Sequence, residues 1–120
     1  MNIKSYLLLS VIFFSFFASC KKDVSLPQLT FTNNISEGTA DANGEYRITG
    51  HISSFVRLDR VILTKEGQST YFILDESTAK NKTEYDFSYL ITGITANTYI
   101  IIDVYDQNGG KSSYRFLIKK

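Results

Sequence analysis

EYDFSYLI, residues 84–91, alternates aromatic or aliphatic side chains with acidic or polar ones over almost its whole length. The apolar set occupies the odd-numbered positions: Tyr85, Phe87, Tyr89 and Ile91. Successive side chains of a β-strand point to opposite faces, so this spacing is typical of a strand with one face on a core. The other face, with Glu84, Asp86 and Ser88, would lie in water. The stretch therefore predicts a half-buried strand in a sheet with one wet side.

Six further segments carry a strand pattern, and turn residues separate them. The turn signals are Asp41–Gly44, Glu66–Gln68 and Asp106–Gly110, and residues 33–44 as a whole indicate a loop or an irregular edge. Helical stripes of Leu or Ala are absent after the first apolar segment, while tyrosine, isoleucine and threonine favour strands. The composition predicts an all-β domain. The six expected strands are residues 29–32, 46–52, 58–65, 71–74, 100–105 and 111–119.

The penultimate strand presents a conflict between Tyr99 and Asp103. If Tyr99 faces the core, strict alternation also buries Asp103, and an unpaired buried carboxylate costs several kcal/mol or shifts its pKa. A β-bulge near Ile101 or Ile102 would reconcile the two, because one extra residue reverses the facing. The facing of Tyr99 and Asp103 stays open at this stage. We expect three apolar side chains of this strand to face the core: Ile100, Ile102 and Val104.

The last third of the chain resembles the corner between strands E, F and G of immunoglobulin-like and fibronectin type III domains. The resemblance rests on Ile94–Tyr99, the apolar strand that follows, and the hairpin turn Asp106–Gly109. In these families a tyrosine opens strand F and an Asp/Asn-Gly hairpin leads into strand G. The resemblance implies a single immunoglobulin-like antiparallel β-sandwich of about seven strands over residues 29–120. The absence of tryptophan from the third strand argues against an antibody-type domain.

The N-terminal residues have the pattern of an exported protein. Lys4 precedes an apolar run over residues 6–17, and small residues lead to Cys20. This order predicts a signal peptide over residues 1–19. The apolar run is too short to cross a bilayer comfortably, since a spanning helix needs about 20 apolar residues.

Phe17-Ala18-Ser19-Cys20 resembles the lipobox of bacterial lipoproteins, in which the cysteine is lipidated and becomes the mature N-terminus. The resemblance implies a lipid on Cys20, attachment to a membrane, and residence in the cell envelope as an outer-membrane lipoprotein that faces the periplasm or the surface. Residues 20–28 would form a lipidated tether. The alternative is an ordinary signal peptide with Cys20 as an incidental thiol. Cys20 is the only cysteine, so the domain can form no internal disulfide.

Composition and motifs argue against nucleic-acid binding and against catalysis. The mature chain would hold twelve basic and twelve acidic residues, without the basic cluster of a nucleic-acid footprint. His51 is expected as a solvated strand residue beside Arg47, without a nearby carboxylate pair, and Asp75-Glu76 as solvated loop charge. Asp41–Gly44 and Asp106–Gly109 could be imagined as calcium loops, but turn chemistry accounts for both. We expect no catalytic residue, no metal site and no cofactor.

A non-catalytic binding or accessory module is the function class that remains best supported. Small sandwiches present loops and sheet faces on a rigid scaffold. Tyr71, Tyr99 and Tyr105 are candidates for outward tyrosines that contact a glycan or an envelope protein. The alternative, which the sequence favours, is that they are ordinary strand residues that pack on their neighbours. A second class is a structural spacer or assembly subunit that uses an exposed strand edge.

Overall fold

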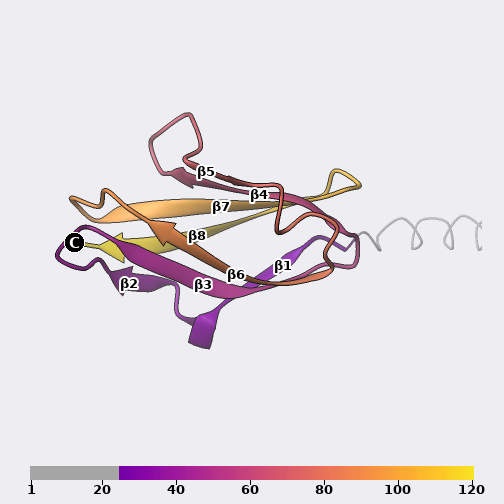
Figure 1. The fold of residues 1–120 in the computed structure, drawn as a ribbon, viewed down its shortest axis with the longest axis horizontal. Helices are drawn as coiled ribbons and strands as arrows, with labels where there is room; N and C mark the ends of the chain where they lie inside the picture. The colour runs from indigo at the N-terminus through magenta and orange to yellow at the C-terminus, as the bar shows by residue number, and fades with distance from the viewer. Residues whose placement is uncertain (1–24) are drawn as a thin grey trace, which may run out of the picture.

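A computed structural model describes residues 25–120 as two β-sheets packed face to face (Figure 1). The three-stranded sheet has the order β1-β3-β6, and the five-stranded sheet has the order β2-β8-β7-β4-β5. Within residues 25–120, no helix is long and apolar enough to cross a membrane. The strands are β1 (Gln28–Phe31), β2 (Glu37–Thr39), β3 (Tyr46–Ser53), β4 (Leu58–Lys65), β5 (Ile73–Asp75), β6 (Glu84–Ile91), β7 (Thr98–Asp106) and β8 (Lys111–Lys119).

Six of the seven expected strands are confirmed to within a residue or two, and the stretch that predicted the fold forms β6. The strand expected at residues 71–74 is displaced to β5, so Tyr71 and Phe72 lie in the preceding loop. The signal peptide, Cys20 and most of the expected tether fall outside the described residues. At the tether's far end Pro27 is already buried, and Gln28 opens β1.

An eighth strand, β2, lies in the stretch expected to be a loop or an irregular edge. It pairs with β8 in parallel, so the sandwich is not antiparallel throughout. β2 exists because the chain leaves the three-stranded sheet after β1 and crosses to the five-stranded one. The crossing is a 3-10 turn, η1 (Thr32–Asn34), in which Asn33 and Asn34 have φ angles of 58° and 57°. Asparagine is one of the few residues with a side chain that visits this left-handed region readily.

The facing of β7 resolves the conflict between Tyr99 and Asp103. The strand pairs with β8 in unbroken register across Ile101 and Ile102, so no bulge occurs there. Tyr99 and Asp103 both point away from the core, while the register irregularity lies on β4, between Leu58 and Arg60. The three side chains expected inside are confirmed as fully buried: Ile100, Ile102 and Val104.

The core fills the space between the two sheets. β3 contributes Ile48 and Ile52, and β6 contributes the inward side chains of its alternating pattern. Phe31 packs edge-on against Phe87 from the same sheet and against Phe116 from the opposite one. These aromatic contacts join the two layers, which lack a disulfide between residues 25 and 120 because the only cysteine is Cys20.

Candidate functional site

The outer side of the five-stranded sheet carries two tyrosines that each lie beneath a guanidinium group. Tyr99 is 39% exposed, and the guanidinium carbon of Arg115 lies 3.9 Å from its ring centroid. Arg60 lies 4.0 Å from the ring centroid of Tyr105 in the same way. Cation–π contacts of this kind contribute about 0.5–1 kcal/mol at exposed sites. We call the outward side chains of β4, β7 and β8 the tyrosine face.

Apolar side chains lie between the two Arg–Tyr pairs. Ile62 of β4 pairs across the strands with Leu74 of β5 and with Asp103 of β7. Ile62 and Ile101 are half-buried and Leu74 is exposed, so part of each remains in contact with water. The hydroxyl of Ser113 donates a hydrogen bond to the Asp103 carboxylate, at 2.5 Å. The face therefore combines an apolar centre with satisfied polar groups around it.

Arg115 is held in place from a second direction. Its guanidinium donates to the Glu66 carboxylate at 2.7 Å, and this hydrogen bond raises the pKa of Arg115. The guanidinium is thus charged at every relevant pH and stays over the Tyr99 ring. Of the three candidate tyrosines, Tyr99 and Tyr105 share this face, whereas Tyr71 lies in the loop before β5 (Figure 1).

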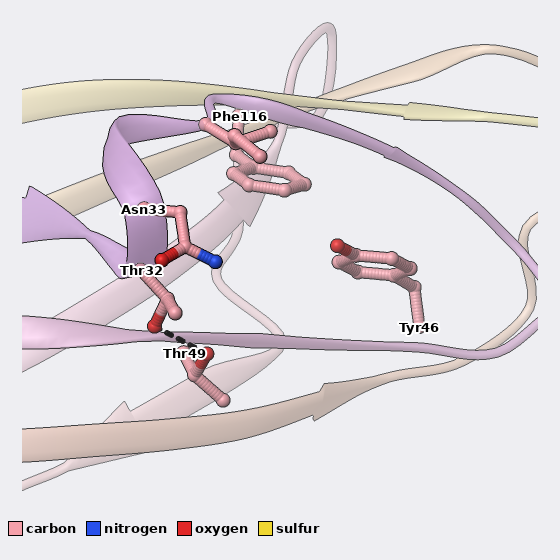
Figure 2. A pocket seen from close by; sticks show the side chains of 6 residues that line it. Thr32, Asn33, Tyr46, Thr49 and Phe116 are labelled. Atoms are coloured by element: carbon pink, nitrogen blue, oxygen red, sulfur yellow. Dashed lines mark hydrogen bonds between the residues drawn. The ribbon is translucent and has the colours of Figure 1, made fainter.

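A surface pocket of about 170 Å³ lies where the chain crosses from one sheet to the other (Figure 2). Two of its polar groups, the Asn33 amide and the Tyr46 hydroxyl, make no hydrogen bond to any side chain or backbone group within residues 25–120. The hydroxyls of Thr32 and Thr49 bond each other at 2.7 Å on its wall. The pocket is lined by Thr32, Asn33, Ile35, Tyr46, Thr49 and Phe116.

This pocket suits a small neutral group. Its lining includes hydroxyls, an amide and aromatic carbon but no charged side chain. Its volume is below the range of about 300–1,000 Å³ that is typical of drug-sized ligands. Sequence reasoning missed it because its lining comes from η1, β3, β8 and the segment after η1. The adjacent Asn33 and Asn34, which favour a left-handed turn, are the only local signal of it.

His51 lies on the outer side of the three-stranded sheet, as expected, but the expectation that it has no carboxylate pair nearby is wrong. Its Nδ1 lies 2.7 Å from the Asp86 carboxylate, and its Nε2 lies 2.8 Å from the Glu84 carboxylate. β3 pairs with β6 so that His51 stands directly opposite Asp86. Hydrogen bonds that the protonated ring donates to Glu84 first, and then to Asp86, raise the pKa of His51 above its ordinary value.

The histidine cluster has the wrong geometry for nucleophilic catalysis. The hydroxyl of Ser53, which shares Glu84 with His51, donates to the Glu84 carboxylate at 2.7 Å and not to the imidazole. A serine nucleophile needs its hydroxyl bonded to a base. Between residues 25 and 120, no group of three His, Cys, Asp or Glu side chains is placed to hold a metal ion.

The pKa of His51 can be read directly by NMR because it is the only histidine in the chain. We expect titration of its ring protons above pH 6.5, the ordinary value. Because the folded-state pKa is raised, the stabilisation is fully present below pH 6.5 and is lost as pH rises through the folded-state value. Glu84→Gln should lower the pKa of His51 toward its ordinary value. Glu37→Gln, a control in β2 and away from the histidine, should leave the pKa unchanged. A ring pKa at or below 6.5 in the unaltered chain would contradict the bonded cluster.

Asp75 was expected to be solvated loop charge, and this prediction is wrong. Its side chain is buried, with 7% of the residue exposed, at the end of β5. The hydroxyls of Tyr89, Tyr85 and Thr78 donate to it at 2.7, 2.9 and 2.8 Å. The backbone amides of Thr78 and Ala79 complete the set.

The protonation of this cluster follows from its hydrogen bonds. Burial would raise the pKa of Asp75, but the bonds from Tyr89, Thr78, Tyr85 and Ala79 outweigh it and hold the pKa below the usual value. Burial, and then the bond to Asp75, raises the pKa of Tyr89. The carboxylate is therefore ionised and the phenols neutral, an arrangement that ties β5 to β6. Every polar atom of Asp75 has a partner, so the cluster is structural.

In the two turns considered above as calcium loops, the aspartate carboxylates accept hydrogen bonds from backbone amides of the same turn. One Asp41 oxygen accepts the amides of Asn43 and Glu45 at 2.9 and 3.0 Å. One Asp106 oxygen accepts the amides of Asn108 and Gly110 at 2.9 and 2.8 Å. Aspartates of this type fold a turn by bonding the backbone two residues on.

Solved structures with a similar arrangement of strands identify the type of β-sandwich. The chain is similar to the fibronectin(III)-like modules of Clostridium thermocellum CbhA, with a TM-score of 0.52 and 21% sequence identity. The match covers 77% of this chain and 94% of that one. The fold is a fibronectin type III-like β-sandwich. No protein-family model and no curated protein matches the sequence.

The fibronectin type III-like fold departs from the expected corner at one position. A corner tyrosine packs its ring inside and bonds the backbone upstream. Tyr99 points outward instead, beneath Arg115, so it forms no such corner. This departure leaves the Tyr99 ring partly exposed on the outer side of the sheet.

Proposed function

We propose that this chain is a lipid-anchored cell-envelope protein that acts as a non-catalytic binding module and takes a protein partner on its tyrosine face. The observation that carries the proposal is the pair of Arg–Tyr stacks, one exposed at Tyr99 and one half-buried at Tyr105, on either side of a half-exposed aliphatic centre. Tyrosine and arginine are enriched in protein interfaces and among the residues that dominate their binding energy. A fibronectin type III-like fold is compatible with this role.

The face is already organised for binding before a partner arrives. Arg115 is fixed by Glu66 as well as by Tyr99, and Asp103 is bonded to Ser113. Immobilising a free side chain on association costs about 0.5–1.5 kcal/mol. Side chains that are already held in place avoid part of this cost. A flat, prearranged sheet surface suits a protein better than a small ligand.

The alternative, an assembly subunit that joins through a strand edge, has less support. The three-stranded sheet has two edge strands, β1 and β6, and β6 carries Glu84 and Asp86 on its outward side. Charged side chains on an edge strand disfavour pairing with another chain. The role of envelope spacer therefore ranks second to partner binding on the tyrosine face.

Cys20→Ala should release the processed protein from membranes. Two or more acyl chains give stable anchoring, at about 0.8 kcal/mol for each buried CH2, and this substitution removes their attachment point. The measurement is fractionation of cells, combined with mass spectrometry of the mature N-terminus. Processed Cys20→Ala protein that still sediments with membranes would contradict the anchor.

Tyr99→Ala combined with Tyr105→Ala should weaken partner binding at least about tenfold, because truncation of a tyrosine that acts as a hot spot costs about 2 kcal/mol or more. A photo-crosslinking residue at Tyr99 should join one discrete envelope protein in intact cells, and the measurement is the crosslinked mass. The matched control places the same residue at Thr30, on the outer side of the opposite sheet. Equal crosslinking from both positions, or none from Tyr99, would contradict the proposed face.

Binding to an oligosaccharide array distinguishes a glycan partner from a protein partner. The neutral pocket at η1 is the place where a sugar residue would fit, since its amide and phenol have no protein partner within residues 25–120. Array binding lost in Asn33→Gly, a change that keeps the left-handed turn, and retained in Tyr99→Ala would assign recognition to the pocket. That result would replace the protein partner by a glycan.

A further inference from the structure

Four segments that are distant in the sequence meet at one end of the sandwich. Gln28 pairs with Ser53, and the amide of Leu58 donates to the carbonyl of Lys82 at 2.8 Å. The amide of Gln107 donates to the Arg57 carbonyl at 2.9 Å. This end, from which β1 starts, lies opposite the loop between β4 and β5 (Figure 1). We call residues 25–28, 53–58, 79–83 and 107–111 the anchor end.

The anchor end presents Phe55, which is 87% exposed at the tip of the loop between β3 and β4. No other large hydrophobic side chain within residues 25–120 is as exposed. Leu26, in the segment beside this loop, is 43% exposed. A single exposed apolar residue is ordinary on a protein surface, so its meaning depends on the surrounding charge.

The charge at the anchor end is mainly positive, with Asp59, Glu84 and Asp106 directly beside its segments. Its four segments contain Arg57, Lys80, Lys82 and Lys111 and no acidic residue. All four cations are exposed. Lys80 lies 3.9 Å from the Asp59 carboxylate, and Lys82 and Lys111 lie 4.8 and 5.7 Å from tyrosine ring centroids.

The loops at the opposite end carry acidic residues, and basic groups lie against them. The Lys65 ammonium donates to the Thr92 carbonyl at 3.0 Å, and Arg115 pairs with Glu66 at 2.7 Å. Residues 40–45, 66–72 and 92–97 contain three acidic residues and no basic one, although Lys119 and Lys120 end the chain nearby. The acidic set is Asp41, Glu45 and Glu66. The charges at the far end are thus mixed, whereas exposed cations lie around Phe55 at the end where the chain enters the domain.

The length of the tether brings this end to the bilayer. Five residue steps separate Cys20 from Ser25, and a fully extended chain spans at most about 3.6 Å for each, or about 18 Å. This step depends on the proposed function, because it assumes a lipid on Cys20. A domain held so close must present its entry end toward the membrane more often than its far end.

We propose that the anchor end docks on an anionic lipid surface, with Phe55 inserted at the headgroup boundary and the four cations around it facing lipid phosphates. Each Lys or Arg near an anionic surface contributes about 1 kcal/mol, and an aromatic ring adds apolar burial. Docking would fix the orientation of the domain and hold the tyrosine face roughly perpendicular to the membrane, open to a neighbouring protein.

The chain contains no tryptophan, so one substitution gives a unique fluorescent reporter. The full chain with Phe55→Trp is placed in vesicles of equimolar phosphatidylcholine and phosphatidylglycerol, with or without brominated acyl chains. We expect a blue shift of the emission and quenching by the brominated lipid. Tyr71→Trp, in the loop at the opposite end, is the matched control and should show neither effect.

The contribution of the cations to docking is measured in the Phe55→Trp protein. Adding Arg57→Gln and Lys82→Gln should lower the docked-to-undocked ratio about fivefold for each lost charge. Vesicles of phosphatidylcholine alone should reduce quenching in the same direction. Quenching that does not respond to either change would overturn the role of the cations.

Mass spectrometry of the N-terminus in the same preparation separates failure of the anchor from failure of docking. A lipidated Cys20 with an unquenched Phe55→Trp variant overturns the docking inference and leaves the anchor intact. Equal quenching of Phe55→Trp and Tyr71→Trp also overturns it, because the domain would then lie on its side. An unmodified Cys20 refutes the anchor, while quenching of Phe55→Trp alone would still support the docking end.

Discussion

Asp75→Ala should lower the free energy of unfolding by about 3–5 kcal/mol, the cost typical of removing one member of a buried charged network. The carboxylate accepts hydrogen bonds from three hydroxyls and two amides, and alanine leaves all five donors in place. A buried donor without an acceptor costs about 1–3 kcal/mol. Urea denaturation of the mature chain, followed by circular dichroism, measures the loss.

The neighbouring carboxylate provides the control for Asp75. Glu76 is exposed, and Glu76→Ala should change the free energy of unfolding by no more than about 0.5 kcal/mol. Adjacent acidic residues would then differ several-fold in effect. Equal and small losses for the two variants would mean that Asp75 is solvated, as the sequence alone indicated, and would refute the buried cluster.

The Asp75 effect should also depend on pH in one direction. Its pKa is lowered in the folded state, so the stabilisation is present above the unfolded pKa of about 3.9. It is lost as pH falls through the folded-state pKa. The difference between the unaltered chain and Asp75→Ala should therefore be largest near neutral pH and shrink below about pH 4.

The sequence contained a signal for this cluster that local pattern reading did not use. The alternation of residues 84–91 placed Tyr85 and Tyr89 on the core side of β6. A buried tyrosine hydroxyl usually finds a hydrogen-bond partner, so two such hydroxyls demand an acceptor within the sandwich. Asp75 is that acceptor, 10 and 14 residues upstream. Its identity could not be deduced because it depends on how β5 crosses to β6.

Strands could be predicted because their alternation is local, whereas pairings across strands could not. His51 meets Asp86 and Glu84 only because β3 and β6 pair in one register, and a slip of one residue would send these side chains to opposite faces. The stacking of Arg115 on Tyr99 likewise depends on the register of β7 with β8. The sequence therefore left the facing of Tyr99 open, and it could not identify the cationic partners of Tyr99 and Tyr105.

Gly50→Ala should lower the free energy of unfolding by about 3 kcal/mol, at the upper end of the usual cost of overpacking. A glycine inside a strand ordinarily costs about 0.5–1 kcal/mol relative to alanine, so the usual expectation is a gain. Here an added Cβ would lie 2.4 Å from the Thr30 carbonyl oxygen and 2.6 Å from the Phe87 ring. The carbonyl belongs to the backbone of β1, which cannot move without losing its pairing with β3.

The origin of the Gly50 effect can be divided between ring and backbone by a double-mutant cycle with Phe87→Ala. Removing the ring relieves one collision, so the two losses should fall short of additivity by about 0.5–3 kcal/mol. The collision with the Thr30 carbonyl persists, so the rescue should be partial. Ser53→Ala, at the exposed end of the same strand, is the control and should cost at most about 1 kcal/mol. A stabilised Gly50→Ala protein would show that β1 does not lie this close to β3, and the three-stranded sheet would have to be rebuilt.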